Sequence, residues 1–326
     1  MEGLELSVVV PCFNEEKGLF ELHRRLTPVC QASVGDSYEI VLINDGSKDN
    51  TWRIMCEMSH ADKHLISINL SRNYGHQIAL SAGLQICRGD RIFVLDADLQ
   101  DPPELLPQMM ALMDHGCDVV FGQRIKRNGE TFFKKTSAYL FYRLLNWMSD
   151  INIPRDTGDF RLMSRRTVDL LNNMPEHYRF IRGMVSWIGL RQEAFKYERA
   201  SRFDGETKYS ISKMMRFAID ALTGFSVRPL RISSYIGLIF NIVALLLLGY
   251  IGIQYISGNN VKGWTFLAVI ILALGSAQML MIGIIGEYLG RLYVESKGRP
   301  LFIIQEIVSS TAPLELKNFR KRKDIV

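Results

Sequence analysis

The strongest constraint on this chain is a long stretch with almost no charge. The 55 residues from Ile232 to Gly286 contain one charged side chain, Lys262, whereas the full 326-residue sequence has 39 Lys and Arg and 34 Asp and Glu. Two runs, 232–256 and 264–286, are uncharged and about as long as the roughly 20 residues that a bilayer-spanning helix needs. Buried helices of a soluble core are the alternative, but they rarely stay uncharged over this length. The pattern predicts two transmembrane helices joined by a short external loop, 257–263.

The charges around these runs predict how the chain is oriented. Residues 1–5 lack a basic region followed by an apolar core, so no secretory signal peptide is expected. Basic residues cluster on the cytoplasmic side of membrane proteins. Those after the second run are Arg291, Lys297, Arg299, Lys317, Arg320, Lys321, Arg322 and Lys323. We therefore expect a multi-pass protein of the inner (cytoplasmic) membrane with both termini in the cytoplasm.

The remaining composition excludes several classes of protein. A hydrophobic content of 48% is too high for a disordered chain, and the 25 glycines show no three-residue period. The five cysteines are odd in number and include no Cys-x-x-Cys pair, so neither a disulfide framework nor a zinc site is indicated.

Apolar, β-branched runs alternate with helix-period segments through the polar part of the chain. The predicted strands are 6–11, 38–43, 64–70, 91–96 and 118–122, and the predicted helices lie near 16–33, 50–60, 75–87 and 103–115. Strands that are apolar throughout and separated by helices predict an α/β fold with a mostly parallel sheet covered on both faces. Ligands of such sheets bind beyond the carboxyl ends of the strands.

The end of the fourth predicted strand is rich in carboxylates. Asp96 and Asp98 are spaced i, i+2 and Gln100 follows, so their oxygens can bind a hard divalent cation that in turn holds a diphosphate. The sequence has neither the glycine-rich dinucleotide fingerprint nor the Walker phosphate loop, so phosphate must be held in some such way. A helix start is the alternative, because Asp101 precedes two prolines.

Several motifs in combination resemble those of one enzyme family. They are Val-Pro-Cys-Phe-Asn-Glu-Glu (10–16), Ile-Asn-Asp-Gly-Ser (43–47), Ser-Arg-Asn-Tyr-Gly-His (71–76), Leu-Asp-Ala-Asp-Leu-Gln-Asp-Pro-Pro (95–103), Gly-Asp-Phe-Arg-Leu-Met-Ser-Arg (158–165) and Ile-Gly-Glu-Tyr-Leu-Gly-Arg (285–291). Over about residues 5 to 305, the chain resembles the family 2 inverting glycosyltransferases with a GT-A, Rossmann-like fold. With two C-terminal transmembrane helices, it resembles the polyisoprenyl-phosphate glycosyltransferases most, including the bactoprenol glucosyltransferases of O-antigen (lipopolysaccharide) modification.

The resemblance implies a role for individual residues around the donor. The residues implied to bind the nucleotide-sugar are Pro11, Phe13, Glu15, Asp45, Arg72 and Asp96. The implied ligands of Mg²⁺ or Mn²⁺ are Asp96, Asp98 and Gln100. For Arg72, an ordinary surface position is the alternative.

Two basic groups are implied to bind the acceptor and donor phosphates. They are Arg124, Arg127, Lys134 and Lys135 in the first group, and Arg199, Arg202 and Lys208 in the second. Arginine suits bidentate phosphate contacts, although any single one of these residues can be an ordinary surface charge. Aromatic platforms for bases are not interleaved with them, so no nucleic acid is expected as a partner.

The resemblance divides the chain into four parts. A cytoplasmic GT-A catalytic domain, 1–210, is followed by an amphipathic interface helix, 211–231, by the two transmembrane helices within 232–286, and by a basic tail, 287–326. A second amphipathic segment, 137–149, suits either the membrane interface or core packing.

The implied reaction moves one sugar from a nucleotide donor to undecaprenyl phosphate at the cytoplasmic leaflet. Glucose from UDP-glucose is the first expectation, and an N-acetylhexosamine, an aminoarabinose derivative and mannose remain open. A processive polysaccharide synthase and a non-catalytic sugar-nucleotide sensor are the other readings, although the first lacks its Gln-x-x-Arg-Trp motif here. Relatives form symmetric oligomers, which makes a tetramer plausible.

Asp159 is the catalytic aspartate that the resemblance implies, and its role tests the whole interpretation. A phosphate acceptor has a second pKa near ~6 and is already ionised at neutral pH, so Asp159 is expected to orient substrate or stabilise charge rather than remove a proton. A helix N-cap before residues 161–171 is the alternative.

We predict that Asp159→Asn lowers turnover severely while nucleotide binding persists. Steady-state transfer assays and nucleotide titrations measure the two quantities separately. A near-normal rate in the Asn variant would remove Asp159 from the mechanism.

Overall fold

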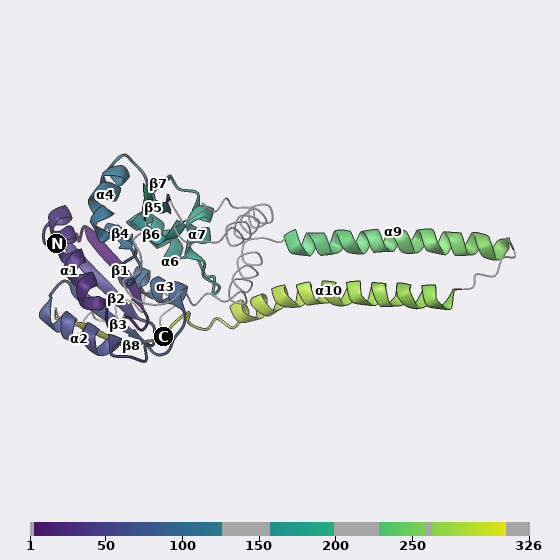
Figure 1. Cartoon of the computed structure of the whole chain (residues 1–326), viewed down its shortest axis with the longest axis horizontal. Coiled ribbons are helices and arrows are strands. Elements are labelled where there is room, and N and C mark those ends of the chain that lie inside the picture. The colour runs from purple at the N-terminus through teal and green to yellow at the C-terminus, as the bar shows by residue number, and fades with distance from the viewer. Residues whose placement is uncertain (1–2, 126–156, 199–227, 258–262, 311–326) are drawn as a thin grey trace. The chain divides into compact units, whose positions relative to one another are not determined.

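The computed structural model describes residues 3–125, 157–198, 228–257 and 263–310. They form two units, which are described separately. One unit contains a sheet and its helices and takes in residues 299–310 as well as the N-terminal part of the chain. The other consists of two long helices (Figure 1).

An eight-stranded mixed sheet forms the centre of the first unit (Figure 1). Its strands are β1 (Leu6–Cys12), β2 (Tyr38–Asn44), β3 (Leu65–Leu70), β4 (Arg91–Val94), β5 (Val119–Arg124), β6 (Thr157–Ser164), β7 (Gln192–Tyr197) and β8 (Ile304–Ser309), in the order β7-β5-β6-β4-β1-β2-β3-β8. β1 pairs in parallel with β2 and β4, β2 with β3, and β5 with β7. β6 is antiparallel to both β4 and β5, and β8 is antiparallel to β3. The predicted α/β fold is confirmed, with three strands that the sequence pattern did not predict.

Helices cover both faces of this sheet. They are α1 (Leu19–Val34), α2 (Thr51–Ala61), α3 (His76–Ile86), the short 3₁₀ helix η1 (Pro103–Leu105), α4 (Leu106–Asp114), α6 (Arg165–Asn172) and α7 (Ile181–Ile188). Alternate residues of a strand face opposite sides. Val8 and Val10 belong to one buried cluster with residues of α1, α2 and α4, whereas Val9 faces α3. A Cβ on Gly83 would lie 2.4 Å from Val9, so glycine permits the close approach of α3 to the sheet.

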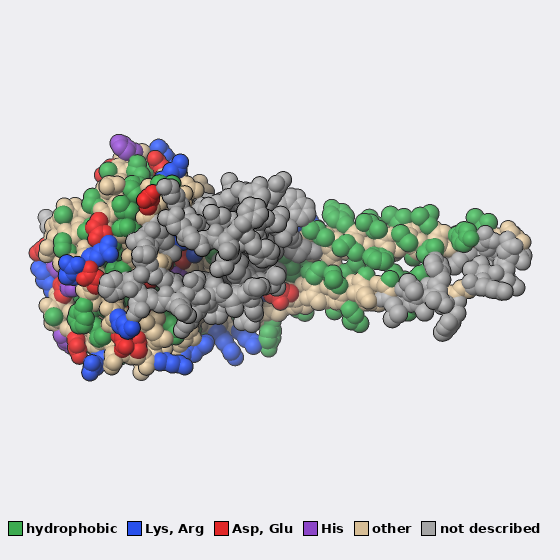
Figure 2. All heavy atoms as spheres, viewed as in Figure 1, with side chains coloured by type: hydrophobic (Ala, Val, Ile, Leu, Met, Phe, Trp, Pro, Cys, Tyr) green, Lys and Arg blue, Asp and Glu red, His purple; other side chains and the backbone are tan. Residues whose placement is uncertain are grey.

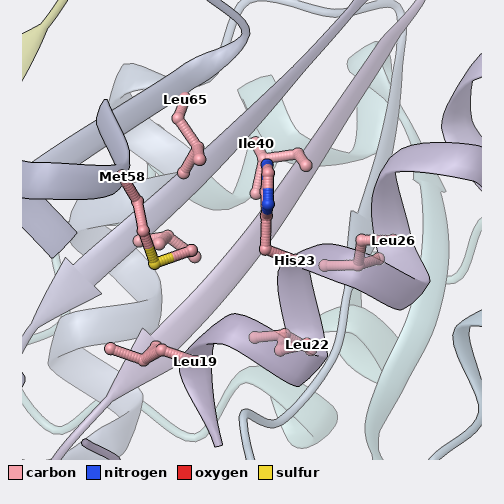
Figure 3. A pocket seen from close by; sticks show the side chains of 8 residues that line it. Leu19, Leu22, His23, Leu26, Ile40, Met58 and Leu65 are labelled. Atoms are coloured by element: carbon pink, nitrogen blue, oxygen red, sulfur yellow. The ribbon is translucent and has the colours of Figure 1, made fainter. Parts of the chain in front are cut away.

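A small apolar recess lies between α1 and the sheet (Figure 3). It is lined by Leu19, Leu22, His23, Leu26, Ile40, Leu42, Met58 and Leu65. Its one polar side chain, His23, is hydrogen-bonded to Asp62 at 2.8 Å. The recess is part of the core rather than a binding site.

The C-terminal strand changes the expected domain organisation. We expected a basic tail over residues 287–326, but α10 extends through the first of these residues and β8 pairs with β3. Hydrogen bonding along the open edge of β3 explains why an apolar segment joins the sheet. The basic cluster 317–323 lies outside the described residues.

The second unit contains α9 (Arg228–Ile256) and α10 (Trp264–Ser296), which are long and apolar enough to cross a membrane. Their described apolar side chains are largely exposed (Figure 2), as with Leu246 at 70% and Met279 at 71%. Core helices of a soluble protein bury such residues, so the alternative of a soluble core does not fit. The predicted segment 137–149 and residues 211–227 of the predicted interface helix 211–231 lie outside the described residues, whereas residues 228–231 form the start of α9 rather than part of a separate helix.

We predict that β8 stabilises the sheet. A chain ending at residue 303 leaves the edge of β3 unpaired and loses backbone hydrogen bonds that contribute about 1 kcal/mol each. Its unfolding temperature in detergent should fall by several degrees. A chain ending at residue 310 keeps β8 and is the control; equal unfolding temperatures for the two chains would contradict the prediction.

Candidate active site

The topology brings the carboxylates singled out in the sequence to one edge of the sheet. Asp45 follows β2 and Asp96 follows β4, and these two strands run in the same direction on either side of β1. β6 runs the opposite way, with Arg161 opposite Val94. Asp159 precedes Arg161 by two residues and therefore lies at the same edge as Asp96.

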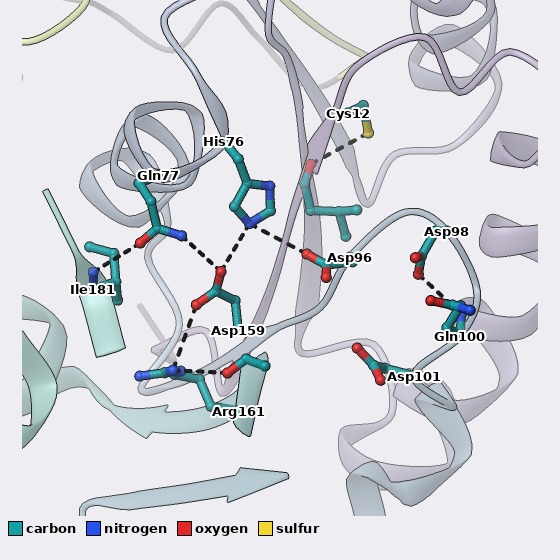
Figure 4. A network of polar contacts seen from close by, with 12 residues as sticks. Cys12, His76, Gln77, Asp96, Asp98, Gln100, Asp101, Asp159, Arg161 and Ile181 are labelled. Carbon is teal, nitrogen blue, oxygen red and sulfur yellow. Dashed lines mark hydrogen bonds and ion pairs between the residues drawn. The ribbon is translucent and has the colours of Figure 1, made fainter. Parts of the chain in front are cut away.

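Asp159 is surrounded by hydrogen-bond donors (Figure 4). Gln77 Nε2 donates to its Oδ2 at 2.8 Å, and His76 Nε2 lies 3.1 Å from the same oxygen. Arg182 Nε donates to Oδ1 at 3.0 Å, and the guanidinium of Arg161 lies 3.7 Å from Oδ1. The carboxylate is 3% exposed, so its charge is compensated almost entirely by these side chains.

These partners determine the ionisation of Asp159. Burial alone would raise its pKa, but Arg182, His76 and Arg161 hold the pKa well below its usual range. Burial lowers the pKa of Arg161 to about 10 although Asp159 opposes that shift, and the guanidinium stays charged at neutral pH. Asp159 is therefore an ionised carboxylate and a poor acceptor for another proton.

The structure excludes the alternative role of Asp159 as a helix cap. Asp159 lies within β6, and the following helix, α6, begins later at Arg165. Ser164 caps that helix, with its side chain accepting a hydrogen bond from the backbone N–H of Thr167.

His76 joins Asp159 to the predicted metal-binding carboxylates. Its Nε2 lies 3.4 Å from Asp96 Oδ1. Burial and the charges of Asp159, Asp101 and Asp98 raise the pKa of Asp96 to about 6, although His76 opposes the shift. Partial burial lowers the pKa of His76, but its hydrogen bond to Asp159 and the charge of Asp96 raise it to about 9. Asp96 and Asp159, which both contact His76, thus have pKa values shifted in opposite directions.

The loop after β4 has ligand atoms suited to a divalent cation. Asp96 Oδ1 is buried and accepts no hydrogen bond, and Asp98 Oδ1 accepts one from the backbone N–H of Gln100 at 3.2 Å. The described residues contain no group of three or more His, Cys, Asp or Glu side chains that would enclose a metal. Two carboxylates spaced i, i+2 on one loop fit a hard cation whose other ligands would be diphosphate oxygens and water.

Asp45 orders the loop that leads to His76. Its carboxylate accepts hydrogen bonds from the backbone N–H groups of Tyr74 and Gly75 at 2.7 and 3.0 Å. Burial raises the pKa of Asp45, and those two bonds oppose the shift. Gly46, at φ +64°, allows the close approach of this loop, since a Cβ there would lie 2.5 Å from the backbone N of Asn73.

The remaining predicted donor-binding residues lie around the ends of β1 and β3. Pro11 is buried within β1, whereas the Phe13 ring is 44% exposed. Glu15 is half-buried, and its backbone N–H donates to Thr51 Oγ1 at 2.9 Å. Arg72 is exposed and its guanidinium carbon lies 4.2 Å from the centre of the Tyr74 ring.

Arg124 is the one predicted phosphate-binding residue that the structure describes. Its Nη2 lies 3.8 Å from Oδ2 of the buried Asp101, and Tyr197 donates a hydrogen bond to Asp101 Oδ1. Arg124 is thereby linked to the loop that carries Asp96 and Asp98. The other predicted phosphate-binding residues, Arg127, Lys134, Lys135, Arg199, Arg202 and Lys208, lie outside the described residues.

Sequence reasoning missed five residues of this site: His76, Gln77, Arg161, Arg182 and Tyr197. His76 ends the motif 71–76, and Gln77 follows it. Two polar residues at the start of the helix predicted near 75–87 could have indicated that this helix end faces the site. Arg182 and Tyr197 lie in segments with no distinguishing pattern. Their proximity to Asp159 and Asp101 depends on strands that the pattern did not predict.

Comparison with known proteins shows the family of this chain. Residues 7–171 match the model of glycosyl transferase family 2. The chain is 44% identical over 304 residues to a Bacillus subtilis (strain 168) protein named uncharacterized glycosyltransferase YkcC, covering 93% of this chain and 94% of that one. It is 38% identical to the bactoprenol glucosyl transferase of Shigella phage SfV, covering 93% and 98%. Glucosyl-3-phosphoglycerate synthase from Mycobacterium tuberculosis is a solved structure with 20% identity and a TM-score of 0.46, covering 68% of this chain and 80% of that one.

The chain therefore belongs to glycosyl transferase family 2 and is a glycosyltransferase. The site at the sheet edge, with Asp159, Asp96 and Asp98, falls within the matched residues. Its two candidate membrane helices and its similarity to bactoprenol-related enzymes indicate membrane association.

We predict a pH-dependent stabilisation by Asp96→Asn. The pKa of Asp96 is about 6 in the fold against an ordinary 3.8, so the unfolded chain loses this proton first and the free energy of unfolding falls as pH rises between these values. Removing the carboxyl should raise the unfolding temperature of the metal-free protein by a few degrees near pH 7 and less near pH 4. The exposed Asp90→Asn is the control, and an equal effect of Asp96→Asn at both pH values would contradict the assignment.

Proposed function

We propose that this glycosyltransferase moves one sugar from a nucleotide donor to undecaprenyl phosphate, with inversion at the anomeric carbon. One observation carries the proposal: His76 contacts both an ionised, almost entirely compensated Asp159 and Asp96, the first carboxylate of the Asp96 and Asp98 pair that follows β4. The two apolar helices and the similarity to bactoprenol glucosyl transferase support a lipid phosphate as the acceptor.

The donor side of the reaction uses the loop after β4. Asp96 and Asp98 would hold Mg²⁺ or Mn²⁺, which neutralises the charge of the departing nucleoside diphosphate when bound. The exposed ring of Phe13 supplies a face for the base, and Arg72 lies beyond β3 at the same edge. UDP-glucose is our first choice of donor because the relative from Shigella phage SfV is named a glucosyl transferase.

The acceptor side needs no protein base. A phosphate monoester has its second pKa near ~6, so its attacking oxygen is already largely ionised at neutral pH. Asp159 accepts hydrogen bonds from Gln77 and Arg182 and keeps its negative charge. It therefore stabilises positive charge at the anomeric carbon and orients the sugar or the acceptor.

The membrane arrangement follows from the same acceptor. Undecaprenyl phosphate keeps its headgroup at the membrane surface, so transfer must take place there. We propose that α9 and α10 span the inner membrane, with the catalytic unit and both termini in the cytoplasm. The basic residues after α10 support this orientation through the positive-inside rule.

The test is a transfer assay with a panel of donors. Membranes containing the protein are incubated with labelled UDP-glucose, UDP-N-acetylglucosamine, UDP-aminoarabinose derivatives or GDP-mannose, with undecaprenyl phosphate and Mg²⁺ or Mn²⁺. We expect label in the organic phase with UDP-glucose, its loss with EDTA, and its loss in Asp98→Ala.

Three results would change the proposal. Lipid product formed only with another donor would replace UDP-glucose as the proposed donor. Transfer that persists in EDTA would show that the reaction needs no divalent metal. Nucleotide binding without lipid product from any donor would favour a sugar-nucleotide sensor.

A further inference from the structure

The side-chain amide of Gln77 links two elements of the site (Figure 4). Gln77 is the second residue of α3. Its Nε2 donates to Asp159 Oδ2 at 2.8 Å, and its Oε1 accepts a hydrogen bond from the backbone N–H of Ile181 at 2.9 Å. A backbone N–H can only donate, so the amide oxygen must face Ile181 and the amide NH₂ must face Asp159. The orientation of Gln77 is therefore determined by its surroundings.

Ile181 is the first residue of α7, and the next residue is Arg182. Arg182 contacts both oxygens of Asp159, with its Nε 3.0 Å from Oδ1 and its Nη2 3.4 Å from Oδ2. Gln77 thus holds the carboxylate and also the start of the helix that supplies the main counter-charge of that carboxylate. The amide of Gln77 therefore fixes the position of the Asp159 carboxylate relative to the start of α7.

The residues just before α3 are hydrogen-bonded to Asp45. Gly75, which immediately precedes α3, donates its backbone N–H to Asp45 Oδ2 at 3.0 Å. The four residues from Tyr74 to Gln77 therefore connect Asp45, a residue of the predicted nucleotide pocket, to Asp159: Tyr74 and Gly75 donate to Asp45, and His76 and Gln77 contact Asp159.

We propose that Gln77 is a positioning residue for sugar transfer, which acts through Asp159 and Arg182 by fixing the carboxylate against the start of α7. This inference rests on the transfer reaction proposed above. Loss of the amide leaves the site chemically complete but permits Asp159 and Arg182 to shift relative to each other. Misplacement of a catalytic group by about 1 Å costs roughly 100-fold in rate.

Gln77→Glu tests the orientation because it changes one atom. One oxygen of the new carboxylate can still accept the hydrogen bond from Ile181. The other oxygen then faces Asp159 Oδ2, which keeps its own negative charge, so the repulsion is relieved only when the new carboxylate takes up the proton. His76, Arg182 and Arg161 are the cationic groups that face this pair and weaken the repulsion. We expect kcat relative to wild type to fall roughly 100-fold near pH 8 and to recover partly near pH 6, with the KM for the donor changed less than about threefold.

Two further variants separate positioning from folding. Gln77→Met removes both hydrogen bonds without adding charge, so its lower kcat should have the same ratio to wild type at both pH values. Gln85→Glu introduces the same charge near the other end of the same helix, eight residues after Gln77, and it should keep normal kcat at both pH values. Thermal unfolding of each variant shows the folded fraction, by which the rates are corrected.

The outcomes are distinguishable from failure of the proposed function. A wild-type protein that makes no lipid-linked sugar overturns the transfer reaction itself. An active wild type with normal, pH-independent kcat in both Gln77→Glu and Gln77→Met overturns the positioning role. A loss of folded protein with normal corrected kcat also overturns it, because Gln77 would then be only structural.

Discussion

Compensation of one buried negative charge organises this active site. Asp159 is almost inaccessible to water, and an isolated ionised carboxylate in such a place costs several kcal/mol. Arg161 comes from its own strand, while Arg182 comes from α7 and His76 and Gln77 from α3. The packing of those elements around β6 is therefore coupled to the charge of one side chain, and a change in any donor affects the ionisation and the position of Asp159 together.

Asp159 and Asp96 lie at the same edge of the sheet but have different surroundings. Asp159 has donors on both oxygens and a depressed pKa, whereas Asp96 retains a buried oxygen without a hydrogen bond and has a raised pKa. Opposite shifts in neighbouring groups indicate different tasks. The ionised form of Asp159 is stabilised by its donors, whereas burial and acidic neighbours disfavour the ionised form of Asp96. His76 contacts both and moderates their repulsion.

Much of this arrangement could be predicted from the sequence, because it depends on local pattern. Apolar runs predicted the five strands of the polar part up to residue 122, and Asp45 and Asp96 lie just beyond the carboxyl ends of two of these strands. The pattern missed β6, β7 and β8, since antiparallel and edge strands carry weaker signals and pair over long separations. Arg182 and Tyr197 became recognisable only when those strands were in place.

The position of β8 in the sequence has a consequence for biosynthesis. Its partner β3 ends at Leu70, while β8 begins at Ile304, after both apolar helices. During translation the edge of β3 stays unpaired until the ribosome has released α9 and α10. The described sheet is therefore completed only after both apolar helices have been synthesised, and β8 then pairs with a strand made more than 200 residues earlier.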